Sequence, residues 1–184
     1  MSRISVIEEN QAEGMIGQVY GMMKSQMGVV PNVVKIFSIW PELFEAHMKI
    51  FQTIMVAETK LPRSIKEMIA ALTSKINQCG YCLSHHVNFM KQYGVDPVMA
   101  NTIGEDYRKA GIDKKTLRLL EYAEKVTKNA YKVTDSDIVG LKEAGWSDSE
   151  ILEATSVVAL FSFINRAADA LGIELETTGS GHKG

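Results

Sequence analysis

The chain has 184 residues, of which 46% are hydrophobic, so it can bury the core of one domain. A formal net charge of −2, with acidic and basic residues interspersed, excludes a strongly basic face for nucleic acid. Uninterrupted apolar runs such as 157–161 are far shorter than a membrane span of roughly 20 residues, and the acidic N-terminus lacks a signal-peptide core. We therefore expect a cytoplasmic protein that binds neither nucleic acid nor membrane.

The first half of the chain predicts helices at three places. A helix is expected over 19–26 and is followed by a turn signal over 28–32. Pro41 opens a stretch over 41–58 in which apolar residues recur at helical spacing. Pro62 suits a helix's first turn, and Ser64 with Glu67 predicts a capping box there.

The second half repeats the same helix-start signals. They are Asp96 before Pro97, Asp113 before a long amphipathic run, Thr134 with Asp137, and Ser147 with Glu150. The last helix is expected from 148 to about 171, where Gly172 stops it. No alternating run of β-branched residues separates these segments, so the sequence predicts an all-α fold.

The helix expected after Pro62 has two faces of low charge. Apolar residues form an ordinary core stripe, while the opposite face carries mostly small residues and a single carboxylate, Glu67. We expect both faces to be packed, either in the same subunit or against a neighbour. Glu67 is then partly buried and needs a partner or a raised pKa.

The densest chemistry lies at 77–86, NQCGYCLSHH. The only two cysteines of the chain, Cys79 and Cys82, are followed at once by His85 and His86, two of its four histidines. In a reducing compartment such a CxxC is more often redox-active, catalytic or metal-binding than a structural cross-link. A structural disulfide that closes so short a loop also stabilises little.

The residues needed for redox chemistry at a thiol lie close to the two cysteines. If a helix begins near Gly80, its first-turn amides favour a thiolate there. Cys82 and His86 are one helical turn apart on the same face, so the imidazole can accept the thiol proton, and His85 is also within one turn. Cys79 is within disulfide range and can resolve a sulfenic acid on Cys82.

Glu67 can orient the histidine only if the chain folds back near 77–80. A straight helix puts Glu67 about 18 Å from residue 79 at a 1.5 Å rise per residue. Gly80 makes such a reversal easy, because glycine adopts conformations that other residues avoid.

Zinc is the alternative for the same residues. Cys79, Cys82, His85 and His86 are suitable ligands, and a CxxC is a common half of a zinc site. No second distant pair exists, however, and adjacent helical histidines diverge by about 100°. The residues favour a redox thiol pair over zinc, and both over a structural or inert pair.

The spacing of Glu67, Cys79, Cys82 and His86, written E-x11-C-x-x-C-x3-H, resembles the active-site signature of alkylhydroperoxidase D (AhpD)-like proteins of the carboxymuconolactone decarboxylase superfamily. The stretches VPNVVKIFSIWPELFEAH and FINRAADALGIELE are similar to those of its "peroxidase-related" branch. The resemblance covers most of residues 15–175. It implies one AhpD-like helical domain over 1–176, which leaves 177–184 as a disordered tail.

The resemblance also implies a homotrimer or homohexamer and a peroxidase that needs no cofactor or metal. Cys82 then attacks the peroxide, Cys79 resolves, and His86 and Glu67 match the proton-relay residues. The best-known members have a histidine between the cysteines, where this chain has Tyr81, a poor base at neutral pH that can donate a hydrogen bond or pack. The reductant is open between a lipoyl domain, a thioredoxin-like protein and a small thiol.

Two other functions compete with peroxide reduction. A disulfide reductase or redox-sensing module would use the same cysteines without peroxide turnover. A lactone decarboxylase, suggested by the superfamily name, needs acid–base residues and no thiol pair, so the intact CxxC argues against it.

Four further positions carry structural expectations. Trp40 and Trp146 are expected to be packing anchors, and His47 a surface or interface residue. Asn165, followed by Arg166 in an otherwise apolar helix, is expected in a buried polar pair or an interface contact.

Overall fold

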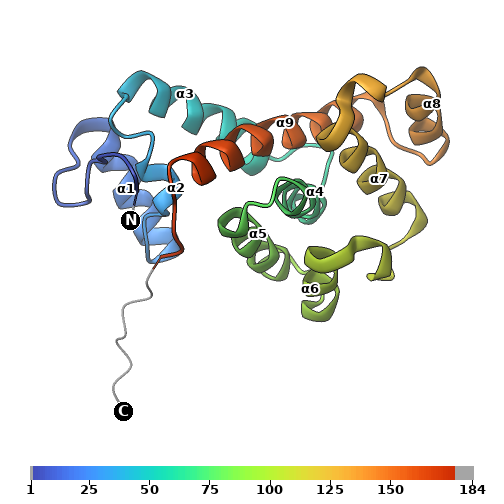
Figure 1. Ribbon diagram of the computed structural model, residues 1–184, viewed down its shortest axis with the longest axis horizontal. Helices are drawn as coiled ribbons and strands as arrows, with labels where there is room; N and C mark the ends of the chain where they lie inside the picture. Colours follow the sequence, from blue (N-terminus) through green and yellow to red (C-terminus); the bar gives the residue numbers. More distant parts are fainter. Residues whose placement is uncertain (1, 177–184) are drawn as a thin grey trace, which may run out of the picture. The chain divides into compact units, whose positions relative to one another are not determined.

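The computed structural model describes residues 2–176, and within them every regular element is helical (Figure 1). The predicted all-α fold is confirmed for this part of the chain. The predicted disordered tail at 177–184 lies outside the described residues. In chain order the elements are α1 (Gly14–Met27), α2 (Asn32–Lys35), α3 (Pro41–Phe51), the π-helix η1 (Gln52–Val56), α4 (Arg63–Ile76), α5 (Gly80–Gln92), α6 (Pro97–Asp106), the 3-10 helix η2 (Tyr107–Lys109), α7 (Lys114–Asn129), the 3-10 helix η3 (Ala130–Lys132), α8 (Asp135–Glu143) and α9 (Asp148–Ala170).

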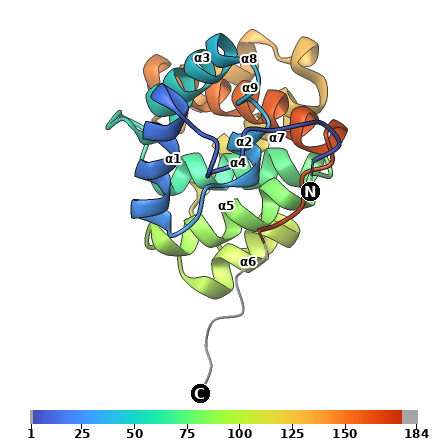
Figure 2. The same cartoon turned by 90° about the vertical axis from the view of Figure 1, so that its left-hand side faces the viewer.

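The chain divides into two compact units. One joins Met1–Lys49 to Ala168–Gly184, of which 2–49 and 168–176 are described, and it contains α1, α2 and nearly all of α3 (Figure 2). The other is the continuous stretch Ile50–Ala167, which contains α4 to α8 and most of α9. The single domain that the sequence predicts over 1–176 stays a prediction.

The first unit ties the start of the chain to the end of α9. The Arg3 amide donates to the Leu171 carbonyl at 2.8 Å, and the Arg3 guanidinium donates to the Asp169 and Ala170 carbonyls at 3.0 Å. The last carbonyls of a helix lack intrahelical donors, so Arg3 caps α9. Gly172, with a φ of 68°, ends the helix as predicted, and a Cβ there would come within 2.8 Å of Arg3.

Most of the predicted capping signals are confirmed, whereas the helix expected over 19–26 begins five residues earlier, as α1 (Gly14–Met27). Asp96 caps α6 through the amides of Val98 and Met99, and Asp113 caps α7 through the amide of Thr116. Capping boxes open α8 and α9, formed by Thr134 with Asp137 and by Ser147 with Glu150.

The predicted capping box of Ser64 and Glu67 is wrong. Helix α4 begins two residues earlier than this box requires, at Arg63, with Pro62 at the N-cap position and no side-chain cap. Glu67 turns into the protein instead, where it binds Arg63 and His86. The arginine offers this buried carboxylate a charged donor and the histidine ring a second N–H, which a single cap amide cannot match.

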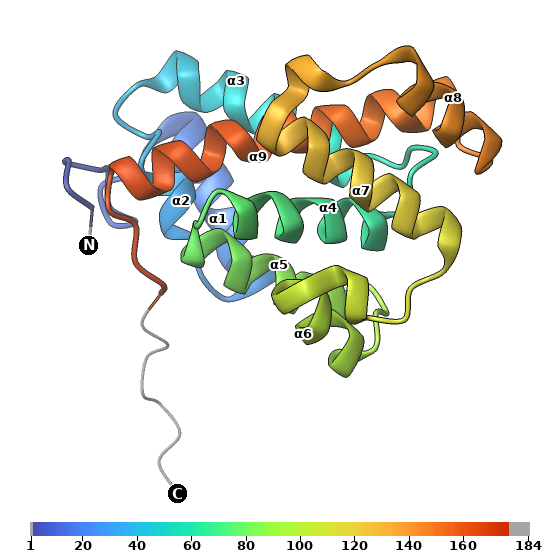
Figure 3. The ribbon, with the colours of Figure 1, turned by 45° about the vertical axis from the view of Figure 1, so that its right-hand side comes forward.

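Helix α4 is packed on all sides within its own unit, as predicted for its two low-charge faces. It is flanked by α5, α6 and α7 (Figure 3). Its Thr73 hydroxyl lies 3.3 Å from that of Thr127 in α7, and Ser74 accepts a hydrogen bond from Asn165 in α9. The small-residue face is therefore covered without a second subunit.

The reversal between α4 and α5 is made by Gln78. This residue has a φ of 63°, in the left-handed region. The Cys79 amide donates to the Ser74 carbonyl and the Gln78 amide to the Lys75 carbonyl, which is the hydrogen-bond pattern of a Schellman motif. Gly80, expected to allow the reversal, is instead the first residue of α5 and has no positive φ.

This turn yields a stability prediction. Gln78→Gly should raise the free energy of unfolding by about 0.5–1 kcal/mol, because glycine adopts the left-handed conformation without the clash of a Cβ. Gly80→Ala is the matched control and should leave stability unchanged or slightly higher, because a Cβ there meets no atom within 4 Å. Urea unfolding of both variants measures the difference. A loss of stability in Gln78→Gly would contradict the assignment of the turn.

Three expectations about packing have different outcomes. Trp146 is confirmed as an anchor: it is 4% exposed, and its indole N–H donates to the Lys115 carbonyl at 3.0 Å. Trp40 is 59% exposed, so that expectation is wrong. His47, expected at the surface or at an interface, is buried within the protein, and its ring stacks on Phe37 with centroids 4.2 Å apart. Burial lowers the pKa of His47 to about 4.

Helix α9 is both long and apolar. Its 23 residues contain an 18-residue window with mean hydropathy 1.3, enough to cross a membrane by length and composition alone. Polar residues interrupt this window, so its uninterrupted apolar runs, such as 157–161, are far shorter than a membrane span. Half of the window is buried within the protein, and core helices of soluble proteins have the same properties, so this is weak support for a membrane span.

Candidate active site

The two cysteines lie at the start of α5, as predicted. Cys79 is the N-cap residue, and Cys82 is the third residue of the helix. The N-cap side chain and the third side chain of a helix are the pair that meets in a capping box, so this arrangement holds the two thiols near each other. Both residues are buried, Cys79 completely.

The first turn of α5 favours negative charge at Cys82. The Cys79 carbonyl accepts the first helical bond, from the Leu83 amide, so the amides of residues 80–82 have no intrahelical acceptor. These amides and the positive end of the helix dipole stabilise an anion in the first turn. Both cysteines lie at this end of α5, and Cys82 in addition shares a helical face with His86.

The side chains of Glu67 and His86 are in contact, as the sequence analysis expects if the chain folds back. The turn at Gln78 makes α5 return alongside α4, and the Nδ1 atom of His86 lies 2.6 Å from Oε2 of Glu67. Both side chains are buried, Glu67 completely. The His86 ring also makes a T-shaped contact with Phe161 of α9, with centroids 4.2 Å apart and an interplanar angle of 83°. The imidazole is thus fixed from two sides.

The charge state of Glu67 decides the tautomer of His86. Burial raises the pKa of the Glu67 carboxyl, but the charges and hydrogen bonds of His86 and Arg63 outweigh burial, and the net pKa lies below its ordinary value. An ionised Glu67 can only accept at Oε2, so Nδ1 of His86 carries a proton and donates it. The basic nitrogen of neutral His86 is then Nε2.

Arg63 is a site residue that the sequence analysis missed. Its Nε atom donates to Oε1 of Glu67 at 2.5 Å, and its guanidinium also donates to the Met55 carbonyl at 2.6 Å. The guanidinium lies over the ring of Tyr93, 4.8 Å from the centroid. The available signal was the spacing of four residues between Arg63 and Glu67, which puts both on one helical face.

Tyr81 and His85 form a separate pair. They are four residues apart on α5, and their rings lie 4.5 Å apart. This pair is displaced from Cys82 and His86 by one residue, which is about 100° around the helix axis. The auxiliary roles suggested for Tyr81 and His85 stay predictions.

Asn165 joins α9 to the turn that carries the cysteines. Its side chain accepts from Asn77 at 3.0 Å and donates to the Ser74 hydroxyl at 3.0 Å. The expected buried polar contact is confirmed for Asn165. Arg166 is exposed and donates to the Ser162 carbonyl of its own helix.

No metal centre is assembled among residues 2–176. This part of the chain contains no group of three or more His, Cys, Asp or Glu side chains that could hold an ion. The four suggested zinc ligands are therefore not arranged as a ligand set.

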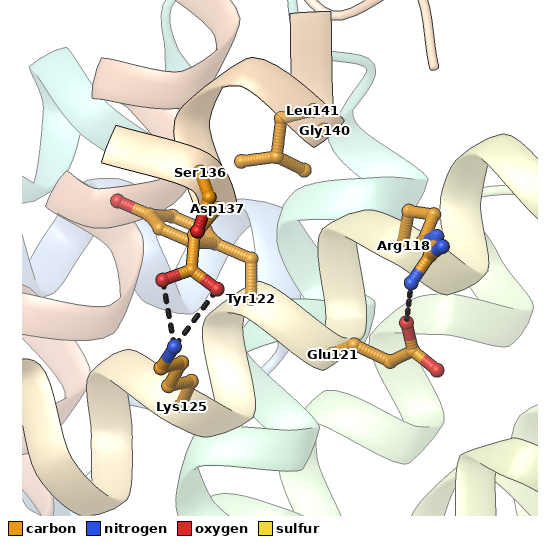
Figure 4. Close-up of a pocket in the computed structure, with 8 residues that line it drawn as sticks. All are labelled: Arg118, Glu121, Tyr122, Lys125, Ser136, Asp137, Gly140 and Leu141. Carbon is orange, nitrogen blue, oxygen red and sulfur yellow. Dashed lines mark hydrogen bonds and ion pairs between the residues drawn. The ribbon is translucent and has the colours of Figure 1, made fainter. Parts of the chain in front are cut away.

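A hollow of about 280 Å³ between α7 and α8 contains none of the predicted site residues. Its charged side chains bind each other: Lys125 donates to both oxygens of Asp137, and Arg118 to Glu121 (Figure 4). Charges already neutralised in this way offer little to a ligand. The lining residues are Arg118, Glu121, Tyr122, Lys125, Ser136, Asp137, Gly140 and Leu141.

A family model and several solved structures relate this chain to the same group of proteins. Residues 41–103, which include the whole Glu67–His86 motif, match the model of the carboxymuconolactone decarboxylase family. The chain is similar to the crystal structure of an alkylhydroperoxidase AhpD core, a peroxidase-related protein from Ralstonia eutropha JMP134. The two are 29% identical over 95% of this chain and 92% of that one, with a TM-score of 0.91.

Two further solved structures are similar. A peroxidase-related protein from Silicibacter sp. TM1040 is 26% identical over 97% of this chain and 91% of that one, with a TM-score of 0.85. The debrominase Bmp8, solved with 2,3,4-tribromopyrrole, is 19% identical over 95% and 91% of the two chains, with a TM-score of 0.80. At this low identity, the similarity to Bmp8 shows the fold alone. No curated protein matches the chain significantly.

Proposed function

Because this chain is an AhpD-like member of the carboxymuconolactone decarboxylase superfamily, we propose that it is a thiol-dependent peroxidase that reduces hydrogen peroxide or alkyl hydroperoxides. Its catalytic residues are Cys82, Cys79, His86 and Glu67. The observation that carries the proposal is the contact between Glu67 and Nδ1 of His86, on the helix that begins with the two cysteines.

The proposed reaction proceeds in two steps at sulfur. The Cys82 thiolate attacks one peroxide oxygen, so that an S–O bond forms, the O–O bond breaks, and the alcohol or water leaves with a proton. The Cys79 thiol then attacks the Cys82 sulfenic acid, forms the disulfide and releases water. A dithiol reductant, such as a lipoyl domain, a thioredoxin-like protein or a small thiol, returns the disulfide to two thiols.

His86 supplies the proton transfer that both steps need. As neutral imidazole with its proton on Nδ1, it accepts the Cys82 proton at Nε2, one helical turn away. The resulting imidazolium is stabilised by Glu67 at 2.6 Å and can return the proton to the leaving oxygen. The start of α5 stabilises the thiolate during this exchange.

The alternative is a disulfide reductase or a redox sensor that uses the same cysteines. Such a protein would exchange disulfides with a partner but would not turn over peroxide. A decarboxylase is disfavoured because His86 lies on the helix that begins with the two cysteines. Decarboxylation needs acid–base residues but no thiol pair.

Peroxide consumption by the purified protein distinguishes these functions. With dithiothreitol or dihydrolipoamide supplied, we expect catalytic loss of hydrogen peroxide or cumene hydroperoxide, measured by a colorimetric peroxide assay. Cys82→Ser is the negative control and should fall to the background rate of the dithiol. Disulfide exchange without peroxide turnover in the wild-type protein would instead support the reductase or the sensor.

A further inference from the structure

Arg63 occupies a position that helix energetics disfavour. It is the first residue of α4, where its positive charge faces the positive end of the helix dipole. It also precedes Glu67 by four residues, which is the weaker of the two orders for a helical ion pair. The pair is therefore a poor device for stabilising the helix, and its placement calls for another explanation.

The guanidinium is held in place by three different groups. Besides Glu67, it binds the carbonyl of Met55 in the π-helix η1 and lies against the ring of Tyr93 beyond the end of α5. Its side chain is only 20% exposed, so its charge acts on Glu67 with little screening by water. These three contacts fix the orientation of the planar guanidinium group, so that its Nε atom faces the Glu67 carboxylate.

From this geometry we infer that Arg63 is a positioning residue of the site, which keeps Glu67 ionised and directed at Nδ1 of His86. The inference deepens the proposed function and rests on it for its catalytic meaning. Arg63 binds one oxygen of the carboxylate and His86 the other, so Glu67 has no freedom to rotate.

Charge balance gives the reason for this arrangement. Without Arg63, a buried carboxylate next to neutral imidazole carries an uncompensated negative charge, which favours uptake of a proton by the pair. With Arg63, the three side chains together carry no net charge when His86 is neutral, and a further proton would leave a buried positive charge. Arg63 therefore favours an ionised Glu67 that accepts from Nδ1 of His86.

His86 and Arg63 are the strongest electrostatic influences on Glu67. The other buried charge on α4 is Lys66, whose pKa is lowered by burial and which is influenced by Glu153 of α9 and by Arg63. Neither Lys66 nor Glu153 is among the influences on Glu67. At the contacts with α7 and α9 described above, the groups are neutral: Thr127 meets Thr73, and Asn165 meets Ser74. Removal of the Arg63 charge is thus expected to act directly on the Glu67–His86 pair.

The test is the titration of His86 by ¹⁵N–¹H correlation NMR in the full chain with both cysteines replaced by serine. Arg63→Met should make the Glu67–His86 pair take up a proton at a pH about 1 unit higher, seen as imidazolium or as loss of the Nδ1–H tautomer. Arg63→Lys, which keeps the charge, should recover most of the wild-type behaviour. Arg118→Met is the matched control, because Arg118 pairs with Glu121 on α7 but is 69% exposed.

Unchanged titration and tautomer in Arg63→Met would overturn the inference. If Arg63→Met does not fold, Glu67→Gln and Arg63→Met/Glu67→Gln, which lack the buried carboxylate charge, decide it. Identical His86 titrations in these two variants support action through Glu67, and different titrations refute it. Because no peroxide is used, failure of this inference is distinguishable from failure of the peroxidase function.

Discussion

In Cys79→Ser, one equivalent of peroxide should leave a sulfenic acid on Cys82 that dimedone traps. Cys82 lies in the first turn of α5 and shares a helical face with His86, whereas Cys79 precedes the helix at its N-cap. Without Cys79 no resolving thiol remains, so the sulfenic acid persists and turnover stops after one cycle. Intact-mass and peptide mass spectrometry would locate the adduct.

Cys82→Ser is the matched variant for this experiment. It retains the resolving thiol, but this thiol is seven residues from His86, about two helical turns, rather than one, so its reaction with peroxide should be far slower. A sulfenic acid on Cys79 that forms in this variant at the wild-type rate would reverse the assignment.

His86→Ala should lower the rate of peroxide reduction by about 100-fold to 10,000-fold, the range expected for loss of a general acid–base. The remaining activity should shift to higher pH, because the Cys82 proton must then leave to solvent rather than to Nε2. Stopped-flow rates of peroxide reaction between pH 5 and pH 9 measure both effects.

Glu67→Gln is the companion of that variant and should have a smaller effect. The amide keeps the shape of the carboxylate and can still accept from Nδ1 of His86, but it no longer stabilises the imidazolium.

A rate in His86→Ala equal to that of the wild type at every pH would remove His86 from the mechanism.

Patterns confined to a few neighbouring residues determined most of the helices. Asp96, Asp113 and the Thr134–Asp137 box mark helix starts because a side chain two or three residues away satisfies an amide that the helix itself leaves without an acceptor. The failure of the capping box predicted at Ser64 has a non-local cause. Glu67 had a stronger partner in His86, nineteen residues further on, than in the nearby amides.

The cysteines and His86 were likewise accessible from the sequence, because a spacing of four residues places side chains on one helical face. Only the tertiary structure decided how Glu67 reaches His86. The turn depends on the left-handed conformation of Gln78. The sequence does not predict this conformation, because glycine and asparagine adopt it far more readily than glutamine. The neutralising role of Arg63 depends on the carbonyl of Met55 and the ring of Tyr93, which lie on other elements. Spacing along one helix can be read from the chain, whereas the charge state of a buried carboxylate depends on groups that only folding brings to it.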